Sequence, residues 1–350
     1  MLVVVVLALK WSAAHKCDSF EDVEMSVQPI RGEPYKTTIN GCIERPAFEN
    51  TIIEAYIRHQ TIPRLGQDSV RNMKHLHGVQ FYRCQISVIE PSAFRNVPSL
   101  RSIQIVANDL AEVPGGVFSR VPSLESLKLN SNKIFNIEED GFGDLPLLKK
   151  IYLDHNRLEV WKKEWFTNTT EIDVMDFRYN QIKMLPKRAF SDLRRLREIY
   201  FDHNELESIQ AEAFGGLKKL DYLGLRYNRL RSIDSKVFPN EVVIKSMMVD
   251  ANYLNFLPKG LRTKLQVGEL NIFGNPWKCP CLDQILSWLH QTNATVKTSN
   301  SCRGENVPVC SSPSTSSTCV DTVDEEVTET YLQGLRKLKP PLDKYCARLD

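Results

Sequence analysis

The sequence lacks a strong excess of charge of either sign. Lys and Arg total 45, and Asp and Glu total 43, so the formal net charge over 350 residues is +2. Proteins that bind nucleic acid through its phosphates usually carry a basic domain or basic clusters. This composition therefore predicts no nucleic-acid partner.

Long apolar runs are scarce as well. The run LVVVVLAL at residues 2–9 is followed by Ser12, Ala13 and Ala14. It is too short to span a bilayer, which takes about 20 residues, and an apolar run before small residues is typical of a signal peptide. No later run reaches 18 apolar residues, and the ending DKYCARLD is too polar for a lipid-anchor tail. We therefore expect a signal peptide at 1–14 and an extracellular, secreted protein without a membrane span.

Cysteine, by contrast, is present in a quantity that indicates an oxidising compartment. The chain has nine cysteines, and disulfides persist in secreted proteins and are rare in the cytosol. The odd number leaves one thiol without a partner in the chain. Asn168 and Asn293 each begin an N-glycosylation sequon, so both are candidate glycosylation sites of an exported protein.

A repeat of 24 residues organises most of the chain. The pattern L-x-x-L-x-L-x-x-N-x-L recurs, and a phenylalanine follows its asparagine position by ten residues in seven successive periods. The asparagine positions are Gln60, Cys84, Asn108, Asn132, Asn156, Asn180, Asn204, Asn228, Asn252 and Asn275. The x-L-x-L part predicts a short strand that stacks about 4.8 Å from its neighbours in a parallel sheet. We expect the asparagine amides to satisfy backbone groups that stacking removes from water, which makes them structural.

These repeats resemble those of extracellular leucine-rich-repeat proteins. The resemblance implies an α/β solenoid, a horseshoe of about ten 24-residue repeats at 52–274 with a parallel sheet on its concave face. Both ends of such a stack need a cover. Cys17 and Cys42 bracket a segment suited to a disulfide-closed hairpin, so we expect an N-terminal cap at 15–51.

The segment 275–320 resembles the cysteine-rich C-terminal cap of secreted leucine-rich-repeat proteins. NPWKCPC at 275–281 opens an amphipathic helix with apolar residues at helical spacing. The resemblance implies that Cys279 and Cys281 each form a disulfide with a cysteine in 302–319. That range also holds one surplus cysteine, either Cys302 or Cys310, which leaves Cys346 as its candidate partner. This part of the chain has six cysteines, which are Cys279, Cys281, Cys302, Cys310, Cys319 and Cys346. Sequence alone cannot choose among their 15 possible pairings.

The tail at 321–350 contains one short amphipathic helix. Val327, Tyr331, Leu335 and Leu338 lie at helical spacing, and Pro340 and Pro341 end the pattern. The helix is too short for a stable coiled coil, which needs three or four heptads. We expect it to dock on the cap, and the alternative is a helix that pairs with a partner.

The side chains between the leucines identify a candidate binding surface. Asp154, Arg178, Asp202, Arg226 and Asp250 follow one another at 24-residue spacing, and His155, Tyr179, His203 and Tyr227 follow beside them, so the motifs DHN and RYN alternate with a period of 48 residues. We expect these side chains to face solvent and the charges to pair between neighbouring turns. Tyrosine and arginine are typical of protein interfaces. The candidate partner-binding residues are Tyr152, Asp154, His155, Asp176, Arg178, Tyr179, Tyr200, Asp202, His203, Tyr222, Arg226 and Tyr227.

The same spacing argues against catalysis and against a metal site. His155 and His203 are two turns apart, about 10 Å, and cannot share a zinc ion whose ligands lie about 2 Å away. Neighbouring turns offer Arg and Tyr but no nucleophile. We therefore expect a protein that is not an enzyme and has no cofactor or metal. The adjacent carboxylates of Asp154 and Asp202 lead us to expect protonation of both histidines near pH 6.

Cys84 occupies an asparagine position. A small thiol there can be buried and inert. The alternative is a disulfide to a partner chain.

From Cys17 to Cys319 the chain resembles secreted arthropod leucine-rich-repeat proteins, on NPWKCPC-LDQILSWL and on PVC at 308–310. The nearest type is a coil-less, short form of the mosquito leucine-rich immune proteins. That resemblance implies a haemolymph factor for innate immunity whose partner is a complement-like protein or a microbial surface component. The alternative is an extracellular matrix or cell-adhesion protein or a shed receptor-like ectodomain. The sequence does not identify the ligand.

Overall fold

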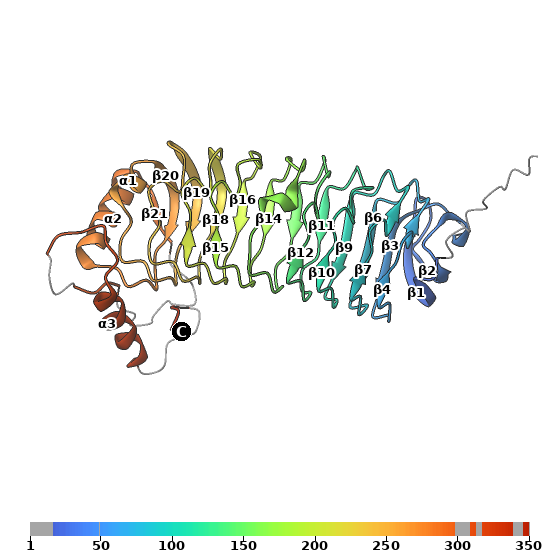
Figure 1. Ribbon diagram of the computed structural model, residues 1–350, viewed down its shortest axis with the longest axis horizontal. Coiled ribbons are helices and arrows are strands. Elements are labelled where there is room, and N and C mark those ends of the chain that lie inside the picture. The colour runs from blue at the N-terminus through green and yellow to red at the C-terminus, as the bar shows by residue number, and fades with distance from the viewer. Residues whose placement is uncertain (1–16, 49, 298–308, 313–316, 339–345, 350) are drawn as a thin grey trace, which may run out of the picture.

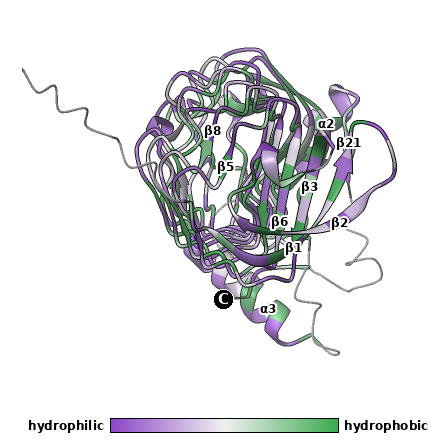
Figure 2. Ribbon diagram, turned by 90° about the vertical axis from the view of Figure 1, so that its right-hand side faces the viewer, coloured by the Kyte–Doolittle hydropathy of each residue, from purple (hydrophilic) through white to green (hydrophobic). Residues whose placement is uncertain are grey.

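The computed structural model describes residues 17–48, 50–297, 309–312, 317–338 and 346–349. The expected signal peptide lies outside these residues. The chain winds into a solenoid in which successive turns stack along the long axis of the molecule (Figure 1). Viewed from one end, the turns overlie one another around a common interior (Figure 2). This is the leucine-rich-repeat solenoid that the sequence predicts, with a parallel sheet of one strand per turn.

One sheet runs the whole length of the solenoid. Its strands in spatial order are β2 Tyr35–Gly41, β1 Phe20–Pro29, β3 Ile52–Arg58, β6 Gly78–Tyr82, β9 Ser102–Val106, β11 Ser126–Lys128, β13 Lys150–Tyr152, β14 Val174–Asp176, β16 Glu198–Tyr200, β18 Lys219–Gly224, β19 Val242–Met248, β20 Leu265–Asn271 and β21 Thr295–Val296. From β3 to β21 every pairing is parallel and in the register of the repeat. Equivalent residues of successive turns therefore form straight columns.

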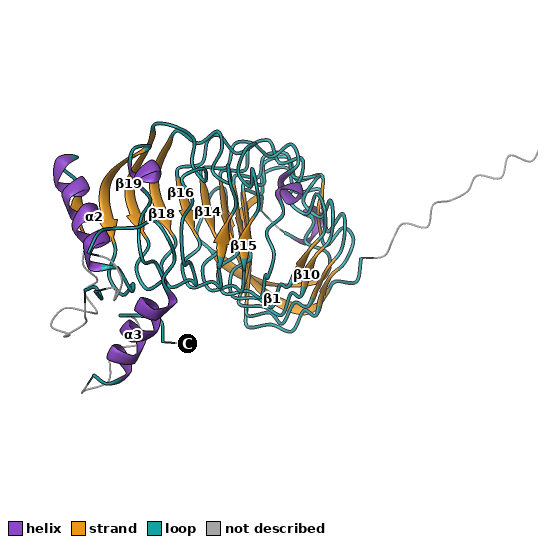
Figure 3. Ribbon diagram, turned by 60° about the vertical axis from the view of Figure 1, so that its left-hand side comes forward, coloured by secondary structure: helices purple, strands orange, loops and turns teal. Residues whose placement is uncertain are grey.

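Shorter elements complete the turns. Four two-stranded parallel pairs lie outside the main sheet, and they are β4 Arg64–Leu65 with β7 Val88–Ile89, β5 Val70–Arg71 with β8 Phe94–Arg95, β10 Glu112–Val113 with β12 Asn136–Ile137, and β15 Met184–Leu185 with β17 Ser208–Ile209. The helical elements are the 3-10 turns Arg45–Ala47 and Lys163–Phe166 and the helices α1 Lys259–Arg262, α2 Cys279–Gln291 and α3 Glu325–Arg336. Loops connect the strands around most of each turn (Figure 3). Within the described residues, none of the helices could cross a membrane by its length and apolarity.

The asparagine column ties each turn to the one before it. Asn156 is buried, its Oδ1 accepts a hydrogen bond from the backbone N–H of Ile134 at 3.0 Å, and its Nδ2 donates to the carbonyl oxygens of Leu129 and Leu153 at 3.0 and 2.9 Å. The asparagines from 108 to 275 repeat this arrangement. Gln60 departs from it, because its side chain is only half-buried and donates to the carbonyl of Arg58 at 3.4 Å.

The phenylalanines form a second column inside the solenoid. The rings of Phe118 and Phe142 stack with centroids 6.4 Å apart, and Phe214 and Phe238 stack at 4.7 Å. Trp161 interrupts the column between Phe166 and Phe190, since its ring centroid lies 5.6 Å from that of Phe166 and 5.0 Å from that of Phe190. Buried aromatic rings have a large apolar surface, so this column supplies a large part of the apolar contact between turns.

The two ends are closed by disulfide-bonded segments. At the N-terminal end, β1 and β2 form an antiparallel hairpin, and Cys17 is bonded to Cys42. At the other end, α2 buries Leu282, Ile285 and Leu289 against the last turn but leaves Leu286 exposed.

The cysteines of the C-terminal segment are paired largely within it. Cys279 is bonded to Cys310 and Cys281 to Cys319. Cys346 is also disulfide-bonded, and Cys302 lies outside the described residues.

Helix α3 docks on the last turns instead of projecting from them. Asp324 caps it by accepting from the N–H of Val327 at 3.1 Å, and the N–H of Asp324 donates to Asn255 Oδ1 at 2.7 Å. Asn255 Nδ2 also donates to Thr328 Oγ1 at 3.1 Å. Tyr331 and Leu335 pack with Cys346 and Ala347 in a separate small core. The apolar face of the helix is thus covered by its own chain, which disfavours the alternative of a partner helix.

Cys84 is wholly buried, and its thiol donates to the carbonyl of Ile57 at 3.4 Å. Burial raises the pKa of this thiol. The alternative of a disulfide to a partner chain is therefore wrong for this fold, because no second chain can reach the sulfur.

Candidate functional site: the strand face and its edge

The candidate residues lie in two neighbouring regions of repeats four to seven, the repeats that contain Asn156, Asn180, Asn204 and Asn228. The strand face, defined as the solvent side of β13, β14, β16 and β18, carries Tyr152, Asp176, Tyr200 and Tyr222. His155, Tyr179, His203 and Tyr227 lie beyond the strand ends, where the chain turns away from the sheet. All four have positive φ, between 54° and 58°. Their side chains therefore do not follow strand alternation, and they form an edge column beside the strand face.

The edge column is a continuous stack of four rings. The centroids of His155 and Tyr179 are 4.3 Å apart, those of Tyr179 and His203 are 4.3 Å apart, and those of His203 and Tyr227 are 4.6 Å apart. The rings are tilted by no more than 24° from one another. A left-handed backbone costs about 1 kcal/mol for such residues. Ring contacts contribute about 0.5–1.5 kcal/mol each and offset that cost.

The strand face contains a cluster of tyrosines held by polar contacts. Tyr200 and Tyr222 stack with centroids 4.6 Å apart, and the hydroxyl of Tyr200 donates to Glu198 at 2.7 Å. Burial raises the pKa of both tyrosines. The guanidinium of Arg178 lies over the ring of Tyr200 at 5.1 Å, and Lys128 lies 5.5 Å from the ring of Tyr152. These rings are therefore fixed and half-buried before any partner arrives.

The expected charge ladder, in which Asp154, Arg178, Asp202, Arg226 and Asp250 pair between neighbouring turns, is only partly correct. Arg178 pairs with Asp176 of its own turn, with Nη2–Oδ2 at 2.5 Å, and not with the aspartates of the neighbouring turns. Asp176 is 2% exposed, so it cannot contact a partner directly as the sequence suggested. The hydrogen bonds that the Arg178 guanidinium donates to Asp176 raise the pKa of Arg178. Asp176 thus positions Arg178, and the guanidinium is the group that faces solvent.

Asp202 and Asp250 are buried, which the expectation of a solvated ladder did not include. Asp202 is 3% exposed and accepts from the N–H of Arg226 at 3.0 Å. A Cβ on Gly224 would overlap Oδ2 of Asp202, so the missing side chain of this glycine makes room for the carboxylate. Arg226 forms the one pairing between turns that the ladder predicts, to Asp250 Oδ2 at 3.0 Å. Burial raises the pKa of Asp202 to about 7 and that of Asp250 to about 6.

The expected protonation of His203 near pH 6 is wrong. Burial, followed by the positive charges of Arg226 and Arg178, lowers the pKa of His203 to about 4. The adjacent Asp202 does not counter this, because its own burial favours the neutral acid. His155 differs in its surroundings, since its side chain is 54% exposed and its Nδ1 lies 2.9 Å from Asp154 Oδ2.

A C-terminal segment that sequence reasoning did not connect with this site lies against the edge column. The hydroxyl of Tyr227 donates to the carbonyl of Ala347 at 3.2 Å. Arg348 is 8% exposed, and its Nη1 donates to the carbonyl of Asn204 at 2.9 Å. Figure 1 shows this end of the chain below β18 and β19. No repeat pattern covers these residues, so no sequence signal placed them here.

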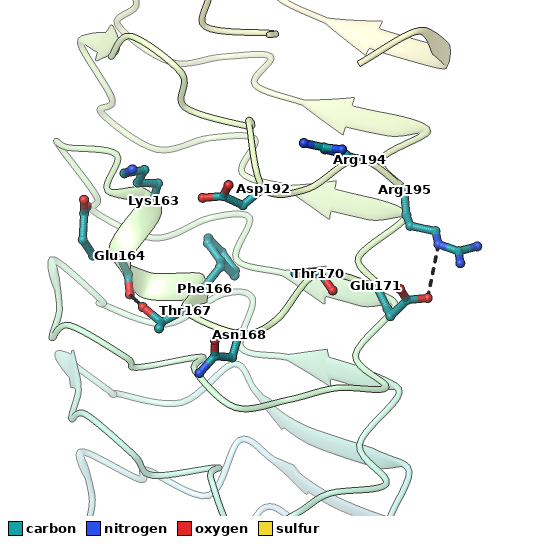
Figure 4. Close-up of a pocket in the computed structure, with 10 residues that line it drawn as sticks. All are labelled: Lys163, Glu164, Phe166, Thr167, Asn168, Thr170, Glu171, Asp192, Arg194 and Arg195. Atoms are coloured by element: carbon teal, nitrogen blue, oxygen red, sulfur yellow. Dashed lines mark hydrogen bonds and ion pairs between the residues drawn. The ribbon is translucent and has the colours of Figure 1, made fainter. Parts of the chain in front are cut away.

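The glycosylation candidates lie elsewhere on the surface. Asn168 is exposed beside a hollow of about 660 Å³ (Figure 4). Its Nδ2 donates to Asp144 Oδ1 at 2.9 Å. In the same hollow Arg195 pairs with Glu171 at 3.3 Å. Asn293 is also exposed, just beyond α2. Among the described residues, no cluster of His, Cys, Asp and Glu is arranged to hold a metal ion.

Comparison with solved structures identifies the same architecture in several complexes. A chain of the mouse RP105/MD-1 complex aligns with a TM-score of 0.57 and 20% identity, over 69% of this chain and 42% of that one. A chain of the Drosophila Toll–Spatzle complex aligns with a TM-score of 0.58 and 18% identity, over 66% and 32%. A complex of Latrophilin 3, Unc5D and FLRT2 contains a chain with a TM-score of 0.51 and 18% identity, over 73% and 87%.

The present chain thus spans less than half of its RP105 and Toll counterparts, and at these identities the likeness concerns the fold. No curated protein sequence matches the chain. Residues 98–158, 146–206 and 194–254 each match the family model described as leucine rich repeat. The chain therefore contains leucine-rich repeats, and its fold is a leucine-rich-repeat solenoid.

Proposed function

We propose that this chain is a secreted, non-enzymatic recognition protein that binds a protein partner with the strand face of repeats four to seven and acts in innate immunity. The cluster of Tyr152, Tyr200 and Tyr222 with Arg178 carries the proposal. Tyrosine and arginine are enriched among the residues that dominate interface energy, and rings that are already fixed lose little entropy on binding. No cofactor is needed for such a function.

The solved complexes support this assignment by analogy of fold. RP105 is seen there in complex with MD-1 and Toll in complex with Spatzle, and the Toll–Spatzle complex is a molecular hub in Drosophila development and innate immunity. The three disulfides that join described cysteines and the two exposed sequon asparagines favour an extracellular location. Together with the resemblance to mosquito leucine-rich immune proteins, they favour a complement-like protein or a microbial surface component as partner.

A matrix or cell-adhesion role, or that of a shed receptor-like ectodomain, is the second candidate. The fold also aligns with a chain in the complex of Latrophilin 3, Unc5D and FLRT2, of which this chain covers 87%. The two roles predict different behaviour in the organism. An immune factor rises in abundance after microbial challenge, whereas an adhesion protein co-purifies with collagenous matrix in unchallenged animals.

The direct test is capture of the partner from body fluid under non-reducing conditions. The bait is the wild-type chain or a variant with Tyr152→Ala, Tyr200→Ala and Tyr222→Ala. We expect the variant to lose the captured protein, since interface anchors of this type cost about 2 kcal/mol or more each when truncated. Tyr56→Ala is the control, because Tyr56 is a partly buried tyrosine of the same sheet on β3, outside the strand face. Equal capture by the triple variant and the wild type contradicts the proposal.

A further inference from the structure

The alternating motifs build two equivalent modules, 48 residues apart in sequence. The first module is Asp154, His155, Asn156, Arg178, Tyr179 and Asn180, and the second module is Asp202, His203, Asn204, Arg226, Tyr227 and Asn228. Both have the same pair of positive-φ ring residues and the same asparagine hydrogen bonds. Two steps of a parallel sheet separate them by about 10 Å. Their backbones therefore offer the same set of groups at the sheet edge.

The second module is occupied by the C-terminal segment of the chain itself. The Arg348 guanidinium donates to the carbonyl of Asn204 at 2.9 Å and to that of Tyr227 at 3.4 Å. The Tyr227 hydroxyl holds the carbonyl of the preceding residue, Ala347, at 3.2 Å. One arginine side chain and one backbone carbonyl are thus recognised together. This contact shows which chemistry the module accepts.

The first module presents the same groups but is open. His155 is 54% exposed and Tyr179 is 41% exposed. Within the described part of the chain, the carbonyl oxygen of Asn156, which corresponds to that of Asn204, accepts no hydrogen bond. The carboxylate of Asp154 belongs to the same module, where its Oδ2 lies 2.9 Å from His155 Nδ1 and 14% of the side chain is exposed. A module with a carbonyl acceptor and a carboxylate favours a cationic donor, and the planar guanidinium stacks well on aromatic rings.

We propose that the first module binds an arginine-containing peptide segment of a partner protein, in the manner in which the second module holds Ala347 and Arg348. This inference rests on the proposed function and specifies the chemistry of the partner at the edge of the same surface. The arginine donates to the Asn156 carbonyl and lies over the exposed rings of the edge column. The Tyr179 hydroxyl donates to the carbonyl that precedes the arginine. Asp154 supplies the attraction between opposite charges.

The test uses a labelled synthetic peptide with the sequence of residues 344–350 and the exchange Cys346→Ser, titrated into the full chain by fluorescence anisotropy. A second peptide carries Arg348→Ala in addition. The protein variants are Tyr179→Ala and Asp154→Asn, and circular dichroism verifies that both are folded. His59→Ala is the matched control, because His59 occupies the same positive-φ position in the repeat that contains Gln60, without belonging to either module.

We expect one peptide site per chain. Removing the arginine or the Tyr179 ring weakens binding by about tenfold to a hundredfold, as is typical for hydrogen bonds of charged groups. His59→Ala leaves the affinity unchanged. Absence of binding at about 1 mM peptide, or binding that Tyr179→Ala and Asp154→Asn do not alter, overturns the proposal. If the peptide test fails but partner capture still depends on the strand-face tyrosines, the proposed function survives. If partner capture also does not depend on these tyrosines, both the peptide site and the proposed function are overturned.

Discussion

In the first module Arg178 pairs with Asp176 of its own turn, whereas in the second module Arg226 pairs with Asp250 of the next turn. The difference originates one column away, where the counterpart of Asp176 is Gly224. The glycine offers no carboxylate to Arg226, and the space that it leaves is filled by Asp202. One side chain on a neighbouring column thus decides which turn a charge pairs with and how deeply the next carboxylate is buried.

The largest expected effect on stability comes from removing the buried asparagine amides, which both modules share. Asn156→Ala and Asn204→Ala each delete an amide that bonds several buried backbone groups. Unsatisfied buried groups cost about 1–3 kcal/mol each, so each variant loses about 3 kcal/mol or more of unfolding free energy. Denaturant unfolding followed by circular dichroism measures the loss. A loss below about 1 kcal/mol in either variant contradicts a structural role for these asparagines.

The next largest effect is expected when the second module is opened by removing the side chain that occupies it. Arg348→Ala deletes the guanidinium that closes the second module, which costs about 1.5–3 kcal/mol in hydrogen bonds of a charged group. The variant is expected to bind two peptides where the wild type binds one. The pKa of His203 rises from about 4 toward its ordinary value, because Arg348 is one of the charges that lower it and water gains access. An NMR titration of the ring protons measures this, and an unchanged pKa contradicts the closing role of Arg348.

Gly224→Ala changes the residue that separates the two charge arrangements. The new Cβ would overlap the Asp202 carboxylate, and this carboxylate must move. Overpacking of this kind costs about 1–3 kcal/mol. The displaced carboxylate gains solvent, so its pKa falls below about 7. Thermal unfolding at several pH values records both changes, with Gly334→Ala on α3, where a Cβ meets nothing within 4 Å, as the control.

The smallest expected effect is the pH dependence of Asp202. Its pKa of about 7 in the folded chain lies above the ordinary value of 3.8, so between these pH values the folded state keeps a proton that the unfolded state loses. This carboxyl group therefore makes stability fall as pH rises through that window. Asp202→Asn carries no such titration, and its stability relative to wild type is expected to increase from pH 5 to pH 8.

His203 changes stability with pH in the direction opposite to Asp202. Its pKa of about 4 lies below the ordinary 6.5, so its contribution to stability is lost as pH falls through that window. The residue is present in both proteins, and its effect cancels in the comparison. Asp154→Asn, at the partly exposed counterpart in the first module, is the control, and a difference as large there would contradict the role of burial.

A fixed period predicted the solenoid, the sheet register and the asparagine column, because every turn repeats the same contacts. The period also identified which positions flank the leucines. It could not predict that Asp202 is buried, because burial depends on Gly224 in another column. Nor could it predict that Arg348 reaches Asn204, since residues 144 positions apart with no shared pattern leave no signal in a single sequence.

The exact 48-residue spacing of the two modules makes their number adjustable. In a solenoid each turn contacts only its neighbours, so a pair of turns can be added or removed without redesigning the rest. Inserting one further DHN and RYN pair would lengthen the molecule by about 10 Å and add an open module. Such a chain would be bivalent, and a ligand with two suitably spaced arginine segments would bind with avidity set by the linker between them.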